Sequence, residues 1–129
     1  RVPVICVVIG EGASGGALGM AIGDKVLMME NAWYSVISPE NCSTILWRSW
    51  DYKEQAADVL KPTAKDMLKL KLIDGIIKEP LGGAHTNLKE SAIFLKKALM
   101  SNLESLKKKS SEERIADRMD KFGSMGVYS

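Results

Sequence analysis

Apolar positions run without interruption near the start of the chain and again a short distance further on. Residues 2–9 read VPVICVVI, and residues 25–29 read KVLMM. Strands of a parallel sheet that is covered on both faces carry continuous apolar runs, whereas strands with one solvent-exposed face alternate between apolar and polar residues. We therefore predict two buried parallel strands joined through a short helix at residues 14–22. Because such strands need neighbours, we expect the chain to be the later part of a larger α/β domain.

Short strands and helices are predicted between residues 30 and 86. Proline favours the first position of a helix, so Ser38-Pro39-Glu40 starts a helix that continues through residue 47. Thr63 and Asp66 resemble a capping box that opens a further helix. The remaining elements are an extended run at 33–37, a helix at 53–60, a strand at 76–77 and a loop at 79–85.

Two helices are predicted after residue 86. Asn87 with Glu90 caps the first, and Ser110 with Glu113 opens the second. Apolar residues spaced by three or four mark the buried face of each helix. The first stripe is Leu88, Ala92, Leu95, Leu99, Leu103 and Leu106, and the second is Ile115, Met119 and Phe122. We expect one domain, with a core portion at residues 1–86 and a C-terminal helical segment at residues 87–129.

Composition narrows the class of protein. The chain has 129 residues, 46% of them hydrophobic and 26% charged, with a net charge of +2, as expected of one soluble globular domain. No nucleic-acid partner and no membrane contact are predicted, because no strong basic excess is present and the first apolar run is too short to span a bilayer. Cys6 and Cys42 lack metal-ligand spacing, so reduced thiols in a cytoplasmic protein and no metal site are expected.

The glycine-rich segment VVIGEGASGGALGMAIGD, residues 7–24, satisfies two side-chain motifs. Residues 10–15 fit the dinucleotide fingerprint G-x-G-x-x-G, and Glu30 follows at the spacing of a ribose-binding acid. This alternative is a nicotinamide-dependent Rossmann oxidoreductase module, although the glycines interrupt its first helix. Residues 12–16 fit the nucleophile elbow G-x-S-x-G, with Ser14, Asp74 and His85 in hydrolase order. Such an order arises readily by chance, and Ser14 also suits a helix cap.

A third interpretation of the segment needs no catalytic side chain. Gly15 and Gly16 at a helix start expose backbone N–H groups that stabilise a developing oxyanion. The structural alternative is that Gly15, Gly16 and Gly19 let the helix pack closely on the sheet. The motifs by themselves leave these interpretations open.

Several separated blocks of the chain resemble one family. VPVICVVIGEGASGGAL, YSVISPE, ILW, LKLID and EPLGGAH occur in the order and spacing of the alpha subunits of bacterial acetyl-CoA carboxylase carboxyltransferase. This resemblance implies a crotonase-like (ClpP/crotonase) α/β fold, present in part, with long C-terminal helices. It also implies transfer of the carboxyl group of carboxybiotin to acetyl-CoA, which forms malonyl-CoA in the first committed step of fatty acid biosynthesis.

The resemblance implies site residues and partners as well. Gly15 and Gly16 are expected to form a backbone oxyanion hole for the biotin ureido oxygen, and biotin itself takes the substrate proton. One implied partner is a beta subunit, which binds the coenzyme A thioester in a tetramer of two alpha and two beta subunits. The other implied partners are the biotin carboxyl carrier protein and biotin carboxylase, and ATP is bound by the whole complex. Activity is expected only with the beta subunit. Ala13 replaces a glycine common in the family, and an inactive crotonase-like assembly fragment is the non-enzymatic alternative.

Overall fold

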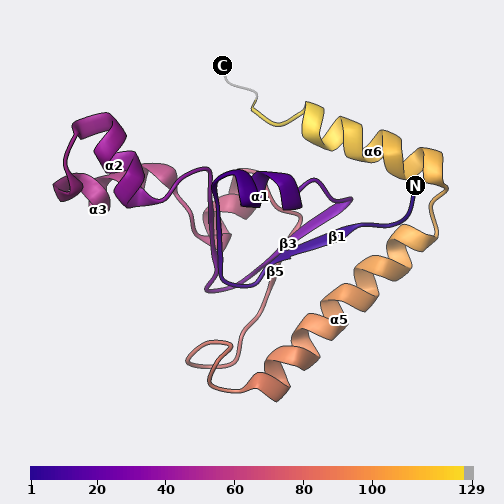
Figure 1. Ribbon diagram of the computed structural model, residues 1–129. Helices are drawn as coiled ribbons and strands as arrows, with labels where there is room; N and C mark the ends of the chain where they lie inside the picture. The colour runs from indigo at the N-terminus through magenta and orange to yellow at the C-terminus, as the bar shows by residue number, and fades with distance from the viewer. Residues whose placement is uncertain (127–129) are drawn as a thin grey trace.

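A parallel three-stranded sheet forms the centre of the structure, a computed structural model that describes residues 1–126 (Figure 1). Its strands lie in the order β1 (Ile5–Val8), β3 (Lys25–Met29) and β5 (Gly75–Ile77). Cys6 pairs with Val26, and Leu27 pairs with Gly75. All pairs are parallel, so the carboxyl ends of the three strands lie at one edge.

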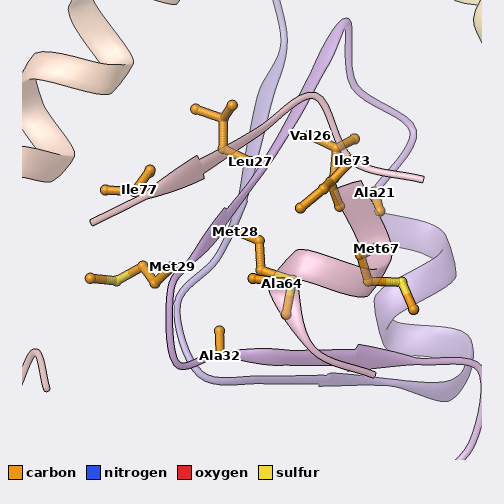
Figure 2. Close-up of a cluster of buried hydrophobic side chains, with 10 residues drawn as sticks. All are labelled: Ala21, Val26, Leu27, Met28, Met29, Ala32, Ala64, Met67, Ile73 and Ile77. Carbon is orange, nitrogen blue, oxygen red and sulfur yellow. The ribbon is translucent and has the colours of Figure 1, made fainter. Parts of the chain in front are cut away.

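The central strand β3 carries the core. Its residues 26–29 are buried, and Met28 has no exposed surface. Figure 2 shows side chains from α4, β5 and the segment around Ala21 gathered about this strand. The expected burial of this strand is confirmed for residues 26–29, whereas Lys25 is only half-buried. Full burial of residues 2–9 is wrong, because β1 pairs with β3 on only one side in the described chain, and Val2 and Ile9 are mostly exposed.

A second, two-stranded sheet was not expected from the sequence. Its parallel strands are β2 (Glu11–Ala13) and β4 (Trp33–Ser35), with Gly12 opposite Tyr34. A Cβ added at Gly12 would lie 3.1 Å from a methyl carbon of Val8 and 3.2 Å from the Tyr34 ring. Glycine therefore allows the close approach of these side chains. The helix α1 (Ser14–Met20) follows β2 directly.

The α-helices with predicted caps between β4 and β5 in the sequence begin where the capping signals predict. The Ser38 hydroxyl accepts the N–H of Asn41, with Pro39 at the first helical position, and the Thr63 hydroxyl accepts the N–H of Asp66. These caps open α2 (Pro39–Trp47) and α4 (Ala64–Lys69), and between them lie the 3-10 helix η1 (Trp50–Tyr52) and α3 (Lys53–Leu60). In Figure 1, α2 and α3 form a helical pair that projects from the sheets.

Helix α5 (Leu88–Lys107) has the predicted cap and covers the predicted stripe from Leu95 to Leu106, but not its first two positions. The Asn87 side chain accepts the N–H of Glu90, as expected. The residues packed against the core are Phe94, Leu95 and Ala98. Leu88 is 75% exposed and Ala92 is also exposed, so the expected stripe is wrong at these two positions. Helix α5 contacts β1 and β5, and its residues that pack against the core come after Ala92.

Helix α6 (Ser111–Gly123) has both bonds of the predicted capping box between Ser110 and Glu113. Its expected apolar stripe is wrong in part, because Met119 is 70% exposed. Its buried residue is instead Arg114, which is 8% exposed. Carboxylates and carbonyl oxygens cover the part of the sheet that α6 meets, so charged side chains attach the helix.

Candidate functional site

The glycine-rich segment changes backbone conformation abruptly at the start of α1. Ala13 is extended, with φ −140° and ψ 159°, whereas Ser14 has a positive φ of 59°. Alanine is therefore tolerated at position 13, where the family commonly has glycine, since an extended backbone accepts any side chain. Ser14 instead holds the left-handed conformation, which costs a non-glycine residue about 1 kcal/mol. The Ser14 side chain is not the cap of α1, contrary to one expectation.

Gly15 and Gly16 lie in the first turn of α1. The first N–H groups of a helix have no carbonyl partner within the helix, and no side chain caps this one. A Cβ added at either glycine would meet no atom within 4 Å, whereas a Cβ at Gly23 would lie 2.9 Å from the Val4 carbonyl oxygen. Close packing of α1 on the sheet is therefore the wrong explanation for Gly15 and Gly16 in the described chain. Their backbone is accessible.

An apolar groove of about 520 Å³ lies beside this helix start. Ser14 and Gly15 are among its lining residues, and the rest of its walls come mainly from α1, β4, α4 and the end of α6. Much of this wall is exposed, since Leu18, Ile22 and Val36 are 73%, 61% and 77% exposed. We call it the α1–α6 groove. Its surface suits an apolar ligand or protein segment placed next to backbone donors.

Tyr34 also lines the α1–α6 groove. Burial raises the pKa of its phenol above the ordinary 10.0, and the nearby Cys6 raises it further. The phenol therefore stays protonated at neutral pH, so it offers a neutral hydroxyl.

The dinucleotide fingerprint lacks the geometry that it needs. In a Rossmann unit the glycine turn leads straight from a strand into a helix. Here Gly12 and Ala13 belong to β2, and that strand pairs with β4 in the second sheet. The Glu30 carboxylate accepts the N–H of Glu79 at 3.4 Å. Glu30 therefore anchors the loop after β5.

The hydrolase residues are not brought together. Ser14, Asp74 and His85 line three different hollows. Asp74 accepts a 2.7 Å hydrogen bond from the N–H of Val26 and a 3.0 Å bond from Lys121. It therefore acts as a structural acceptor near the amino end of β3, and within residues 1–126 Ser14, Asp74 and His85 do not form a triad.

The sequence motifs did not single out Glu79. Its carboxylate accepts the N–H and the side-chain amide of Asn31, at 2.9 and 3.0 Å, and the N–H of Ala84 at 2.7 Å. These bonds join the loops after β3 and β5 beside a hollow of about 500 Å³ lined by His85. The signal in the sequence was EPLGGAH, where Gly82 and Gly83 take positive φ values of 89° and 102°.

Glu79→Gln is expected to weaken the pH dependence of stability. Burial raises the pKa of Glu79, but the bonds from Asn31 and Ala84 and the charge of His85 outweigh it and lower the pKa below the ordinary 4.5. A lowered folded pKa stabilises the protein above pH 4.5, and that stability is lost as the pH falls through the folded value. Urea unfolding from about pH 7 to about pH 3 is the measurement.

The stability lost on Glu79→Gln should be constant near neutral pH and shrink in acid. Glu104→Gln, at an exposed position of α5, is the matched control and should show no such convergence. A wild-type advantage that stays the same at about pH 3 would contradict the role given to the Glu79 charge.

Residues 1–126 contain neither a cluster of metal ligands nor a helix that could span a membrane. Among residues 1–126, no three His, Cys, Asp or Glu side chains gather in a way that would hold a metal ion. In the same part of the chain, every helix is too short or too polar to cross a bilayer.

Comparisons with known proteins point to one family. Residues 1–126 match the family described as acetyl co-enzyme A carboxylase carboxyltransferase-like. The protein of Chlorobium limicola named acetyl-coenzyme A carboxylase carboxyl transferase subunit alpha is 59% identical over 127 residues, which are 98% of this chain and 38% of that protein. The protein of the same name from Flavobacterium psychrophilum is 56% identical over 129 residues, which are 100% of this chain and 41% of that protein. The chain thus spans about two fifths of the length of these relatives.

A solved structure supports the fold. Transcarboxylase 12S, with methylmalonyl-coenzyme A and methylmalonic acid bound, superposes with a TM-score of 0.65 over 85% of this chain and 21% of that chain. The two chains are 20% identical, so this likeness speaks for the fold alone. The predicted crotonase-like α/β fold is confirmed. The family match covers nearly the whole chain, and the chain belongs to the acetyl co-enzyme A carboxylase carboxyltransferase-like family.

Proposed function

We propose that this chain contributes the biotin-side half of a carboxyltransferase active site. The reaction moves the carboxyl group of carboxybiotin to the methyl carbon of acetyl-CoA and yields malonyl-CoA. Support comes from the family match over residues 1–126 and from the names of the relatives. The observation that carries the proposal is the accessible pair Gly15 and Gly16 at an uncapped helix start.

Backbone donors suit this chemistry. Carboxybiotin, when bound, supplies an activated carboxyl group. The N–H groups of Gly15 and Gly16 would face the ureido oxygen of the biotin ring, where negative charge develops as the carboxyl group leaves. Fixed donors need no reorganisation at that moment, and losing one donor costs other enzymes about 3 kcal/mol of transition-state stabilisation.

The α1–α6 groove supports the same assignment. Its lining is mostly apolar, and it begins at Ser14 and Gly15. Apolar walls keep water away from a bound ligand, and hydrogen bonds from fixed donors are worth more when water is excluded. Covering of the groove by a partner or ligand would therefore strengthen hydrogen bonds from the N–H group of Gly15, which lies in its lining.

Partner proteins complete the proposed enzyme. The relatives are named as alpha subunits, which supports a multisubunit enzyme. We assign binding of the coenzyme A thioester to a beta subunit, in a tetramer of two alpha and two beta chains. The biotin carboxyl carrier protein, carboxylated by biotin carboxylase, would deliver carboxybiotin to this tetramer. We place the enzyme in the cytoplasm, with residues 1–86 as the core portion and residues 87–129 as the helical segment of one domain.

Product formation tests the proposed function. The protein at its native length is combined with the beta subunit, carboxylated carrier protein and acetyl-CoA, and malonyl-CoA is measured by mass spectrometry. We expect malonyl-CoA only when the beta subunit is present. Absence of product from the complete mixture, together with saturable NAD(H) binding lost in Glu30→Ala, would favour the oxidoreductase alternative instead.

A further inference from the structure

A charged hollow of about 240 Å³ lies between helix α6 and the amino ends of strands β3 and β5. All but one of its lining residues carry an ionisable side chain. The basic residues are Lys25, Lys109, Arg114, Arg118 and Lys121, and the acidic residues are Asp24, Asp74 and Asp117. Five positive and three negative side chains leave two positive charges in excess. We call this the α6 hollow.

Arg114 is a buried cation in the lining of the α6 hollow, with only 8% of the residue exposed. Its two terminal nitrogens donate to the carbonyl oxygens of Leu106, Lys109 and Arg1 and to the Ser111 hydroxyl. A guanidinium group has five N–H donors, so these bonds leave one over. The remaining donor, on Nε, has no hydrogen-bond partner within residues 1–126.

The charge of Arg114 is not balanced by a carboxylate of the described chain. The three aspartates of the α6 hollow form their ion pairs with lysines and with Arg118 instead. Carbonyl and hydroxyl oxygens satisfy N–H donors, but they do not neutralise a full charge. A buried cation without a counter-ion is unfavourable, because the hydration that it lost is not replaced. An anion in the α6 hollow would supply the missing counter-ion.

Arg118 offers further donors to the same hollow. It follows Arg114 by four residues on α6, so the two side chains lie on one side of the helix. Its Nε lies 3.5 Å from a carboxylate oxygen of Asp24, and its side chain is 25% exposed. Its terminal nitrogens form no hydrogen bond with another group of residues 1–126. The planar guanidinium group binds phosphate through paired hydrogen bonds, so Arg118 suits an oxyanion.

We propose that the α6 hollow binds one phosphate group, with Arg114 and Arg118 as its donors. A phosphate group carries nearly two negative charges at neutral pH, which match the two positive charges in excess. The hollow is several times larger than the about 30 Å³ of one water, and smaller than the about 300–1,000 Å³ of sites for drug-sized ligands. It therefore suits inorganic phosphate or the phosphate of a small metabolite. The inference does not depend on the proposed carboxyl transfer.

Calorimetric titration of the native-length protein tests the phosphate site. Inorganic phosphate and glycerol 3-phosphate are titrated separately, with the ionic strength held constant by chloride. We expect saturable binding at one site with a Kd below about 1 mM, and the ligand that binds more tightly shows whether the phosphate is free or esterified. Failure of both ligands to saturate the protein at about 10 mM would overturn the proposal.

Arg118→Gln is expected to weaken phosphate binding at least about tenfold, because it removes a charge and paired donors. Arg48→Gln is the matched control, since Arg48 is exposed and lies outside the α6 hollow, and it should change the Kd less than about twofold. Circular dichroism checks folding. If Arg118→Gln does not fold, Arg118→Lys takes its place and should weaken binding at least about threefold, because lysine lacks the paired donors. Equal Kd values for the Arg118 and Arg48 variants would overturn the proposal.

Thermal unfolding separates a specific site from a general salt effect. A ligand that binds only the folded state raises its stability by mass action, whereas exclusion of phosphate from the surface acts on every variant alike. Phosphate at about ten times the wild-type Kd should raise the unfolding midpoint of the wild type and of Arg48→Gln equally. In Arg118→Gln the rise should be less than about half as large. The same rise in all three proteins would contradict a site at the α6 hollow.

Discussion

Gly16→Pro is expected to lower the rate of carboxyl transfer by at least about a hundredfold, whereas Ser14→Ala should keep most of it. Proline has no N–H, so it deletes the proposed oxyanion donor. Ser14→Ala removes only a hydroxyl and keeps the Cβ at the positive φ of 59°, so the backbone strain is unchanged. Initial rates of malonyl-CoA formation by the assembled enzyme are the measurement.

Gly16→Ala provides the matched control for the proline variant. A Cβ at this position meets no protein atom within 4 Å, and the N–H is retained. We expect the alanine variant to lose less than about tenfold in rate, with a far-ultraviolet spectrum like that of the wild type. Circular dichroism of all three variants checks that α1 still folds. A folded, active Gly16→Pro together with an inactive Ser14→Ala would contradict the backbone mechanism.

Met28→Ala is expected to lower the free energy of unfolding by about 2–5 kcal/mol. Met28 is fully buried in the central strand β3, between the paired strands β1 and β5. Truncation removes apolar contacts on the face of the sheet to which the side chain points, and leaves a cavity that close-packed neighbours fill only in part. Urea unfolding monitored by circular dichroism measures the change, with the slope of the transition compared as well.

Met119→Ala is the same substitution at an exposed site. Met119 is 70% exposed on α6, and alanine is a good helix former, so stability should change by less than about 0.5 kcal/mol. Equal losses for Met28→Ala and Met119→Ala would show that α6 buries the apolar stripe expected from the sequence and that the charged attachment is wrong.

Both the sequence and the tertiary structure were needed to choose between the catalytic interpretations of the glycine-rich segment. The sequence offered a dinucleotide turn, a nucleophile elbow and a backbone oxyanion hole on overlapping residues. The pairing of β2 with β4 excluded the dinucleotide turn. The nucleophile elbow was excluded because Ser14, Asp74 and His85 lie in three separate hollows. Each motif consists of near neighbours in the chain, whereas a site depends on which distant segments meet it.

The sequence by itself determined the features that depend on near neighbours. Helix starts at Ser38, Thr63, Asn87 and Ser110 follow from capping bonds that span three residues, and the burial of β3 follows from its continuous apolar run. The resemblance of separated blocks likewise identified the family.

Only the tertiary structure decided the features that depend on distant partners. The pairing of β2 with β4, the two loops joined by Glu79 and the charged attachment of α6 each connect segments that are far apart in the chain. Periodicity marked Met119 as buried, but the surface facing α6 presents Asp24, Asp74 and carbonyl oxygens, which bind cations. A helix buries the face that complements its neighbour, and the identity of that neighbour is a property of the fold.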